Sequence, residues 1–207
     1  MKIGLVLERF DPARGGLEQW SYQFAAGMAA RGHQVHALAG SFSETARRLP
    51  IAIHQLRATR GRLDFGRAAE EAARGLDLDV VHDTGAGWYC DVFQPHGGSR
   101  TAVIEQGVLL LPRYMRPAKR AVAKVLPRYR EFAALARRQY VDDGRIFLAL
   151  SNRVADDFQR LHGVRPQQIR VIPNGVDTER FSPQHREHHR RAVRGQLGVD
   201  DGTLLLL

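Results

Sequence analysis

Three short segments of the sequence combine glycines with residues that can exchange protons or bind anions. The first runs from Glu8 to Glu18 and contains the adjacent glycines Gly15 and Gly16 at the expected start of a helix. Backbone N–H groups at a helix start, together with the helix dipole, bind phosphate well, and glycines let a ligand come close. The pattern is neither G-x-G-x-x-G nor a Walker loop. An alternative of equal weight is that the two glycines have no role in binding and only allow a tight turn between strand and helix.

The second segment is a short apolar run that ends in His82, followed by Asp83 and Thr84. A side chain at the carboxyl end of a strand faces the ligand crevice of an open parallel sheet. His82 is therefore a candidate substrate-binding residue. A purely structural role, as a hydrogen-bonded residue at a strand end, is the favoured alternative.

The third segment, residues 92–100, places His96 directly before Gly97 and Gly98, with Arg100 two residues further on. The two glycines keep the space beside the imidazole open. A neutral imidazole can accept a proton or a hydrogen bond from a hydroxyl group, and arginine pairs with phosphate or carboxylate. We therefore predict His96 as a catalytic residue and Gly97, Gly98 and Arg100 as substrate-binding residues.

Other arrangements that carry chemistry are missing from the sequence. It contains no H-E-x-x-H, C-x-x-C or G-x-S-x-G pattern. The cluster His185, His188 and His189 belongs to a charged helical segment, where we expect solvation and no metal site. We expect no metal and no cofactor.

The elements that must position these residues alternate between strands and helices. We expect Asp64 and Ser151 to cap helices, Gly32 and Gly163 to end them, and Pro127 to interrupt the long basic helical region. This alternation, with nearly continuous apolar strands, predicts an α/β fold with a doubly wound, Rossmann-like parallel sheet. The expected strands are 2–7, 34–39, 51–56, 79–82, 91–94, 146–150 and 169–172, and the expected helices are 16–31, 64–74, 116–141 and 152–161.

Positive charge is concentrated in one stretch of the chain. The formal net charge is +9, and nine basic residues stand against Glu131 alone between Arg113 and Tyr140. Such a concentration suggests an anionic partner: membrane headgroups, a phosphorylated substrate or nucleic acid. An alternative of equal weight is that this stretch has no anionic partner and forms solvated helices whose arginine side-chain stems cover apolar surface.

The composition of 43% hydrophobic and 26% charged residues is ordinary for a globular protein, and 207 residues can form one or two domains. Cys90 is the only cysteine, which suits a reducing compartment. The uncharged run Ile3–Leu7 is too short for a signal peptide, and no apolar run has the length of a membrane span. We expect a cytoplasmic protein.

Residues 169–183 carry the strongest resemblance to a known family. A short β-rich run ends at Pro173-Asn174-Gly175, which predicts a turn, and Pro183 is expected to stop regular structure. This segment closely resembles the connector between the two halves of family-4 glycosyltransferases, which have two Rossmann domains (GT-B fold). The stretches Gly15-Gly16-Leu17-Glu18 and Ala30-Arg31-Gly32-His33-Gln34-Val35 are also similar to the opening of that family.

The resemblance implies roles for individual residues. It places Gly15 and Gly16 near the diphosphate of the sugar donor, with Glu18 and His82 at the substrate. It puts His96 on the acceptor side of the cleft. The family often has a second histidine where this chain has Thr84, so the resemblance implies no role for a second imidazole here.

The resemblance also implies a domain division. Residues 1–172 would form the Rossmann-like acceptor-binding domain, residues 173–183 the interdomain connector, and residues 184–207 the start of a truncated donor-binding domain, with the apolar end 203–207 as a strand. The second domain of the GT-B fold is then essentially absent, so this chain alone is expected to be inactive and to need a separate C-terminal domain chain.

Within the family, the chain looks most like transferases of the lipopolysaccharide core. Such enzymes transfer a sugar from a nucleotide sugar, with retention, to a glycolipid or polysaccharide acceptor, usually without a metal, and many sit on the inner face of the membrane. The alternative is a non-catalytic module that binds an anionic membrane or lipid. Nucleic-acid binding has no motif to support it, and the missing dinucleotide fingerprint disfavours an NAD-linked oxidoreductase.

Overall fold

The computed structural model describes residues 1–57, 61–179 and 181–205. The chain divides into two compact units, Met1–Pro173 and Asn174–Leu207, which are described separately here. All described strands belong to the first unit and form one parallel sheet in the order β3-β2-β1-β4-β5-β6-β7. The strands are β1 (Lys2–Phe10), β2 (Gln34–Phe42), β3 (Ala52–Gln55), β4 (Val80–Asp83), β5 (Val92–Phe93), β6 (Ile146–Ala149) and β7 (Ile169–Val171).

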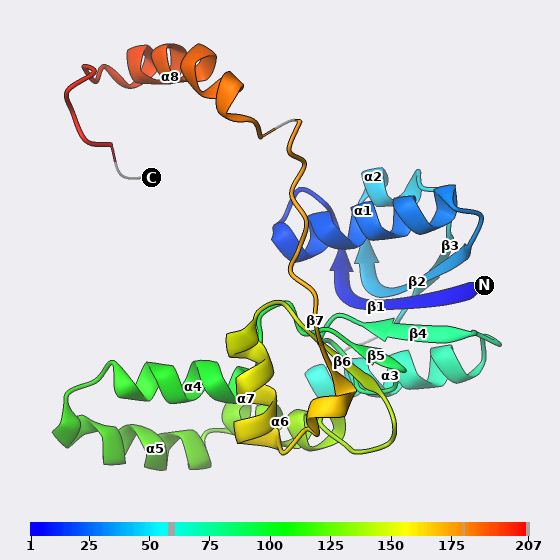
Figure 1. The fold of residues 1–207 in the computed structure, drawn as a ribbon. Helices are drawn as coiled ribbons and strands as arrows, with labels where there is room; N and C mark the ends of the chain where they lie inside the picture. Colours follow the sequence, from blue (N-terminus) through cyan, green and yellow to red (C-terminus); the bar gives the residue numbers. More distant parts are fainter. Residues whose placement is uncertain (58–60, 180, 206–207) are drawn as a thin grey trace. The chain divides into compact units, whose positions relative to one another are not determined.

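Helices pack on both faces of this sheet (Figure 1). In Figure 1, α1 lies over one face and α3 over the other, as expected when each crossover between parallel strands is right-handed. The expected doubly wound, Rossmann-like fold is therefore confirmed. The helices of this unit are α1 (Gly16–Ala30), α2 (Glu44–Arg47), α3 (Arg62–Arg74), α4 (Arg100–Leu109), α5 (Arg116–Val125), α6 (Pro127–Gln139) and α7 (Asn152–His162), with the 3-10 turns η1 (Arg113–Met115) and η2 (Pro166–Gln168).

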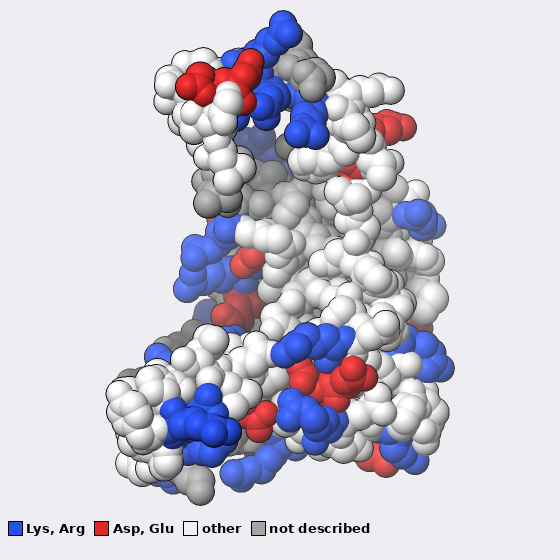
Figure 2. Space-filling view, turned by 60° about the vertical axis from the view of Figure 1, so that its left-hand side comes forward, with Lys and Arg blue, Asp and Glu red and all other residues white. Residues whose placement is uncertain are grey.

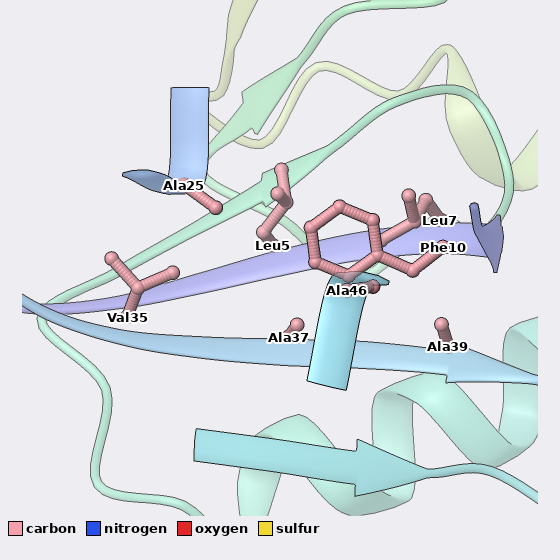
Figure 3. Packing of buried hydrophobic residues seen from close by; sticks show 8 residues of the cluster. All are labelled: Leu5, Leu7, Phe10, Ala25, Val35, Ala37, Ala39 and Ala46. Atoms are coloured by element: carbon pink, nitrogen blue, oxygen red, sulfur yellow. The ribbon is translucent and has the colours of Figure 1, made fainter. Parts of the chain in front are cut away.

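The core consists of side chains that alternate between the two faces of β1. Leu5 and Leu7 point toward the α1 side and are completely buried, and they pack there with Phe10 and Ala25 (Figure 3). Val6 points to the opposite side and packs in a second cluster with residues of α3. Burial on both faces explains why this strand reads as an uninterrupted apolar run.

The expected helix ends are largely confirmed. Ser151 accepts a hydrogen bond from the Val154 N–H at the start of α7, and Gly163 ends that helix with φ +67°. The proposed cap Asp64 is wrong: the residue before α3 is Gly61, and Asp64 lies in the first turn, where its negative charge still suits the helix dipole. The basic helical region is broken at Leu126, so Pro127 begins α6.

Helix α4 was not expected from the sequence. It precedes α5, and the two helices lie side by side and project away from the sheet (Figure 1). The Arg116 guanidinium closes this helical hairpin by donating to the backbone oxygens of Leu109, at 2.9 Å, and Leu111, at 3.0 Å.

Three expectations for the end of the chain are wrong. Neither Asn174 nor Gly175 has a positive φ, and this stretch is an extended connector without a turn. Pro183 does not stop regular structure but begins α8 (Pro183–Leu197), because proline is well accommodated in the first helical turn. Residues 203–205 form no strand, and residues 206 and 207 lie outside the described part.

Candidate active site

A cavity of about 340 Å³ opens at the carboxyl ends of β1 and β4. The order of strands along the chain reverses between these two neighbours, and ligands of open parallel sheets bind at this point. The walls come from the end of β1, the first turn of α1, the start of α3, the loops after β4 and β5, the first turn of α4, and α6. The whole cavity belongs to the first unit of the chain.

The loop after β4 is held by the carboxylate of Asp83. This side chain is completely buried and accepts hydrogen bonds from the N–H groups of Gly85 at 2.7 Å, Ala86 at 2.8 Å and Gly87 at 2.7 Å. Burial raises the pKa of Asp83 to about 6, although the three backbone hydrogen bonds oppose this shift. The Gln139 side chain of α6 donates to the backbone oxygens of Gly85 and Gly87. This wall of the cavity is therefore fixed from two sides.

Glycines permit the close approach of the loops after β4 and β5. Gly85 has φ +103°, and a Cβ there would lie 3.0 Å from the Cα of Pro95. Gly98 has φ +65°, which side chains other than glycine rarely adopt. A Cβ at Gly97 would meet no atom within 4 Å, so this glycine leaves open space at the cavity wall.

The first turn of α4 is anchored by Ser99. Its hydroxyl accepts a hydrogen bond from the Ala102 N–H and lies 2.7 Å from Nε2 of His162. The His162 ring in turn stacks on Tyr140, with ring centroids 3.6 Å apart. These contacts fix the backbone from which Arg100 reaches the cavity.

Two arginines of the cavity share one aromatic ring. The guanidinium carbon of Arg62 lies 5.2 Å from the centroid of Phe132, and that of Arg100 lies 5.1 Å from the same centroid. Arg62 also forms an ion pair of 2.5 Å with Glu8. A cation above an aromatic face gains about 0.5–2 kcal/mol, which restricts the orientation of both guanidinium groups.

His82 and His96 do not line the cavity but pack together against α1. The ring centroid of Trp20 lies 4.4 Å from the ring centroid of His96 and 5.6 Å from that of His82. His82 Nε2 is hydrogen-bonded to Gln94 Oε1 at 2.9 Å, whereas the buried Nε2 of His96 has no hydrogen-bond partner among the described residues. Burial lowers the pKa of each histidine to about 4, so both rings are neutral at pH 7.

Gly15 precedes the first turn of α1, and no side chain caps this helix start. Gly15 has the extended angles φ 179° and ψ −177°, which do not require glycine. A Cβ at Gly16 would meet no atom within 4 Å, whereas a Cβ at Gly15 would lie 3.2 Å from Oε2 of Glu18, so only Gly16 leaves open space at the first turn of α1. Neither glycine lines the cavity, although Leu17 and Glu18 do.

The cavity thus brings together four of the residues selected from the sequence: Glu18, Gly97, Gly98 and Arg100. The other four, Gly15, Gly16, His82 and His96, lie outside its lining, and the roles of all eight residues stay predictions.

Sequence reasoning missed Asp83, Arg62 and Phe132. An acidic residue at a strand end before Gly85-Ala86-Gly87 is a usable signal for Asp83, because a carboxylate can accept hydrogen bonds from several consecutive N–H groups. No local pattern marks Arg62 or Phe132, because only the packing of α3 against α6 brings them together.

Comparison with known proteins decides the family. The family model described as Glycosyltransferase Family 4 matches residues 14–180, a range that covers most of the cavity walls. This chain belongs to Glycosyltransferase Family 4. No curated protein gives a significant match.

Solved structures confirm the fold of this family-4 chain. The crystal structure of WaaG, a glycosyltransferase involved in lipopolysaccharide biosynthesis, is similar with a TM-score of 0.72 and 19% sequence identity, over 96% of this chain and 52% of that chain. A glycosyltransferase from Rickettsia africae ESF-5 is similar with a TM-score of 0.53 and 14% identity, over 98% of this chain and 50% of that chain. The chain spans about half the length of both structures.

Proposed function

We propose that residues 1–207 provide the acceptor-binding half of a retaining glycosyltransferase that uses a nucleotide-diphosphate sugar. The observation that carries this proposal is the family-4 match over residues 14–180, which covers most of the walls of a cavity at the ligand-binding edge of the sheet. The proposed acceptor is a glycolipid or a polysaccharide of the lipopolysaccharide type, in line with the similarity in fold to WaaG.

In this proposal the two sides of the sheet edge have different tasks. The uncapped first turn of α1, with Gly15 and Gly16, faces the donor diphosphate, and the cavity with Glu18 and Arg100 receives the acceptor. His96 lies outside the cavity lining, beside Trp20, but its side chain is only partly buried, and we keep it as the proposed group that accepts a hydrogen bond from the reacting hydroxyl. With a pKa of about 4, this ring acts by hydrogen bonding and is too weak a base to remove a proton completely.

Residues 1–207 by themselves are expected to transfer no sugar. The solved relatives are about twice as long, and transfer requires both walls of a cleft to position the reactants and exclude water. The other half would be supplied in the same polypeptide or by a separate chain.

The experiment is transfer from a panel of UDP-, GDP- and ADP-sugars by residues 1–207, alone and mixed with a separately supplied donor-binding domain. Activity in the mixture only is the expected result, and it would identify the donor. Activity of residues 1–207 alone would refute the half-enzyme proposal. Inactivity of both, with each domain folded, would refute the transferase function.

A second proposal concerns the hairpin of α4 and α5, which we assign to docking on an anionic membrane surface. Large apolar side chains are exposed along it: Leu110 is 87% exposed, Tyr114 81% and Val125 73%. Basic side chains accompany them, including the exposed Arg113 and Arg120. In Figure 2 the lower part of the molecule, where the hairpin comes forward, shows blue groups beside white surface, with some red groups among them.

Exposed apolar side chains flanked by cations are typical of segments that lie in the membrane interface. Two basic residues of α6 differ from this pattern, because their guanidinium carbons lie over aromatic rings. That of Arg138 is 4.6 Å from the Trp88 ring centroid, and that of Arg128 is 5.0 Å from the Tyr129 ring centroid. The docking surface is therefore the hairpin rather than the whole basic stretch. None of the helices in the described residues is long and apolar enough to span a membrane. We propose that the hairpin binds peripherally to the cytoplasmic face of the membrane.

Vesicle sedimentation tests the docking proposal. Residues 1–207 should bind vesicles with anionic phospholipid, bind less in high salt, and leave pure phosphatidylcholine vesicles unbound. Leu110→Asp should weaken binding about tenfold, since it removes apolar contact and adds like charge. Ala133→Asp, an exposed position on α6, is the matched control. Equal losses in both variants would contradict a specific role for the hairpin.

A further inference from the structure

The lining of the cavity carries an excess of positive charge. Its charged side chains are the cations of Arg9, Arg14, Arg62 and Arg100 and the anions of Glu8 and Glu18, which leaves an excess of two positive charges. The arginines come from the end of β1, the loop before α1, and the starts of α3 and α4. Four separate places in the fold therefore direct cations toward one volume.

One of these arginines is held in position without being neutralised. Arg62 and Arg100 both lie over the ring of Phe132, so their guanidinium carbons are no more than about 10 Å apart. The charge of Arg62 is balanced by Glu8. Arg100 forms no ion pair with the residues that the structure describes. Its guanidinium is thus oriented by an aromatic ring, and its hydrogen-bond donors stay available.

Apolar side chains also line the cavity. Leu17, Pro95, Phe132 and Leu135 line it, and Leu135 is 5% exposed. In a concave site, apolar side chains beside a cation strengthen its interaction with an anionic ligand, because they reduce screening by water.

We infer that this cavity recognises the phosphate group of a phosphorylated sugar on the acceptor, with Arg100 as the principal contact. The inference rests on the proposed function and adds the chemistry of its acceptor. An excess of two positive charges matches a phosphate monoester dianion better than a single carboxylate. The planar guanidinium fork also suits two phosphate oxygens. A volume of about 340 Å³ is small for a ligand site and fits one phosphorylated sugar unit.

The test is titration of isotope-labelled residues 1–207, followed by NMR, with glucose 6-phosphate, glucose, glucuronate, inorganic phosphate and UDP. Glucose 6-phosphate and inorganic phosphate should compete and shift the amide signals of Gly97 to Thr101 in a saturable way that weakens with salt. Glucose should cause no shift at the same concentrations, and glucuronate should bind more weakly. Binding of glucose as strong as that of its phosphate would overturn the inference. So would binding of UDP alone, or no saturable shift by either phosphate.

Matched variants locate the contact. Arg100→Gln should weaken glucose 6-phosphate binding about 10- to 100-fold, the effect of losing a charged hydrogen bond, and Arg100→Lys should lose less. Arg48→Gln, at the exposed end of α2 outside the cavity, should bind as the wild type does. Thermal unfolding should be the same for all variants. Unchanged affinity in Arg100→Gln would refute the role of Arg100.

Failure of this inference is distinguishable from failure of the proposed function. If the two-domain mixture transfers sugar equally well to neutral and phosphorylated acceptors, the inference fails and the function stands. If glucose 6-phosphate binds as described but no mixture transfers sugar, the anion site stands and the transferase function fails.

Discussion

Replacing Asp83 by Asn should change how the stability of the protein depends on pH. Asp83 is completely buried, and burial raises its pKa from 3.8 to about 6. Between pH 3.8 and about pH 6, Asp83 keeps its proton in the folded protein and has lost it in the unfolded chain, so the free energy of unfolding falls as the pH rises. The stabilisation is fully present below about pH 3.8 and is lost as the pH passes about 6. The full difference is about 3 kcal/mol, of which about 2 kcal/mol falls between about pH 4.5 and about pH 7.5.

Asp83→Asn removes this titration but also one hydrogen-bond acceptor. The remaining side-chain oxygen can serve Gly85 and Ala86, whereas the new NH₂ group faces the N–H of Gly87. That mismatch costs about 1–3 kcal/mol at every pH. The informative quantity is therefore the change with pH of the stability difference between variant and wild type, because all other titrating groups cancel in it.

The assay is urea unfolding of both proteins at several pH values across this range. Relative to the wild type, the variant should gain about 2 kcal/mol in free energy of unfolding between about pH 4.5 and about pH 7.5. Asp156→Asn, at an exposed position on α7, is the control and should give a constant difference. A constant difference for Asp83→Asn as well would show that burial does not raise its pKa, and the reasoning about this loop would be wrong.

Two further predictions concern α3 and the histidine pair. Gly66→Ala should destabilise the protein by a few kcal/mol, because the new Cβ would lie 2.1 Å from the buried ring of Trp88. Helix propensity alone would instead favour the alanine by about 1 kcal/mol. A higher urea midpoint for the variant would contradict this packing. His96→Ala should lower sugar transfer by the two-domain mixture about a hundredfold and leave the circular dichroism spectrum unchanged. His33→Ala is the control. Full activity of His96→Ala would remove His96 from the mechanism.

Some helix boundaries follow from local chemistry and could be read from the sequence. Ser151 and Gly163 bound α7 as expected, because a hydroxyl cap and a left-handed glycine act within one helical turn. The helix at Arg100–Leu109 escaped the sequence analysis. Its partly exposed faces carry no regular apolar stripe, since Val103 and Leu109 are exposed while Ala102 and Val108 are buried.

What the sequence by itself determined is the alternation of strands and helices, and with it the parallel sheet and the edge at which ligands bind. It also showed the glycine-rich segments that place Glu18, Gly97 and Arg100 at that edge, because residues at the carboxyl ends of parallel strands necessarily meet there. Only the tertiary structure decided that Phe132 orients Arg62 and Arg100, and that His96 turns toward Trp20 instead of the cavity. These contacts depend on how α1, α3, α4 and α6 pack, and side-chain directions across helices are set by packing that no local pattern encodes.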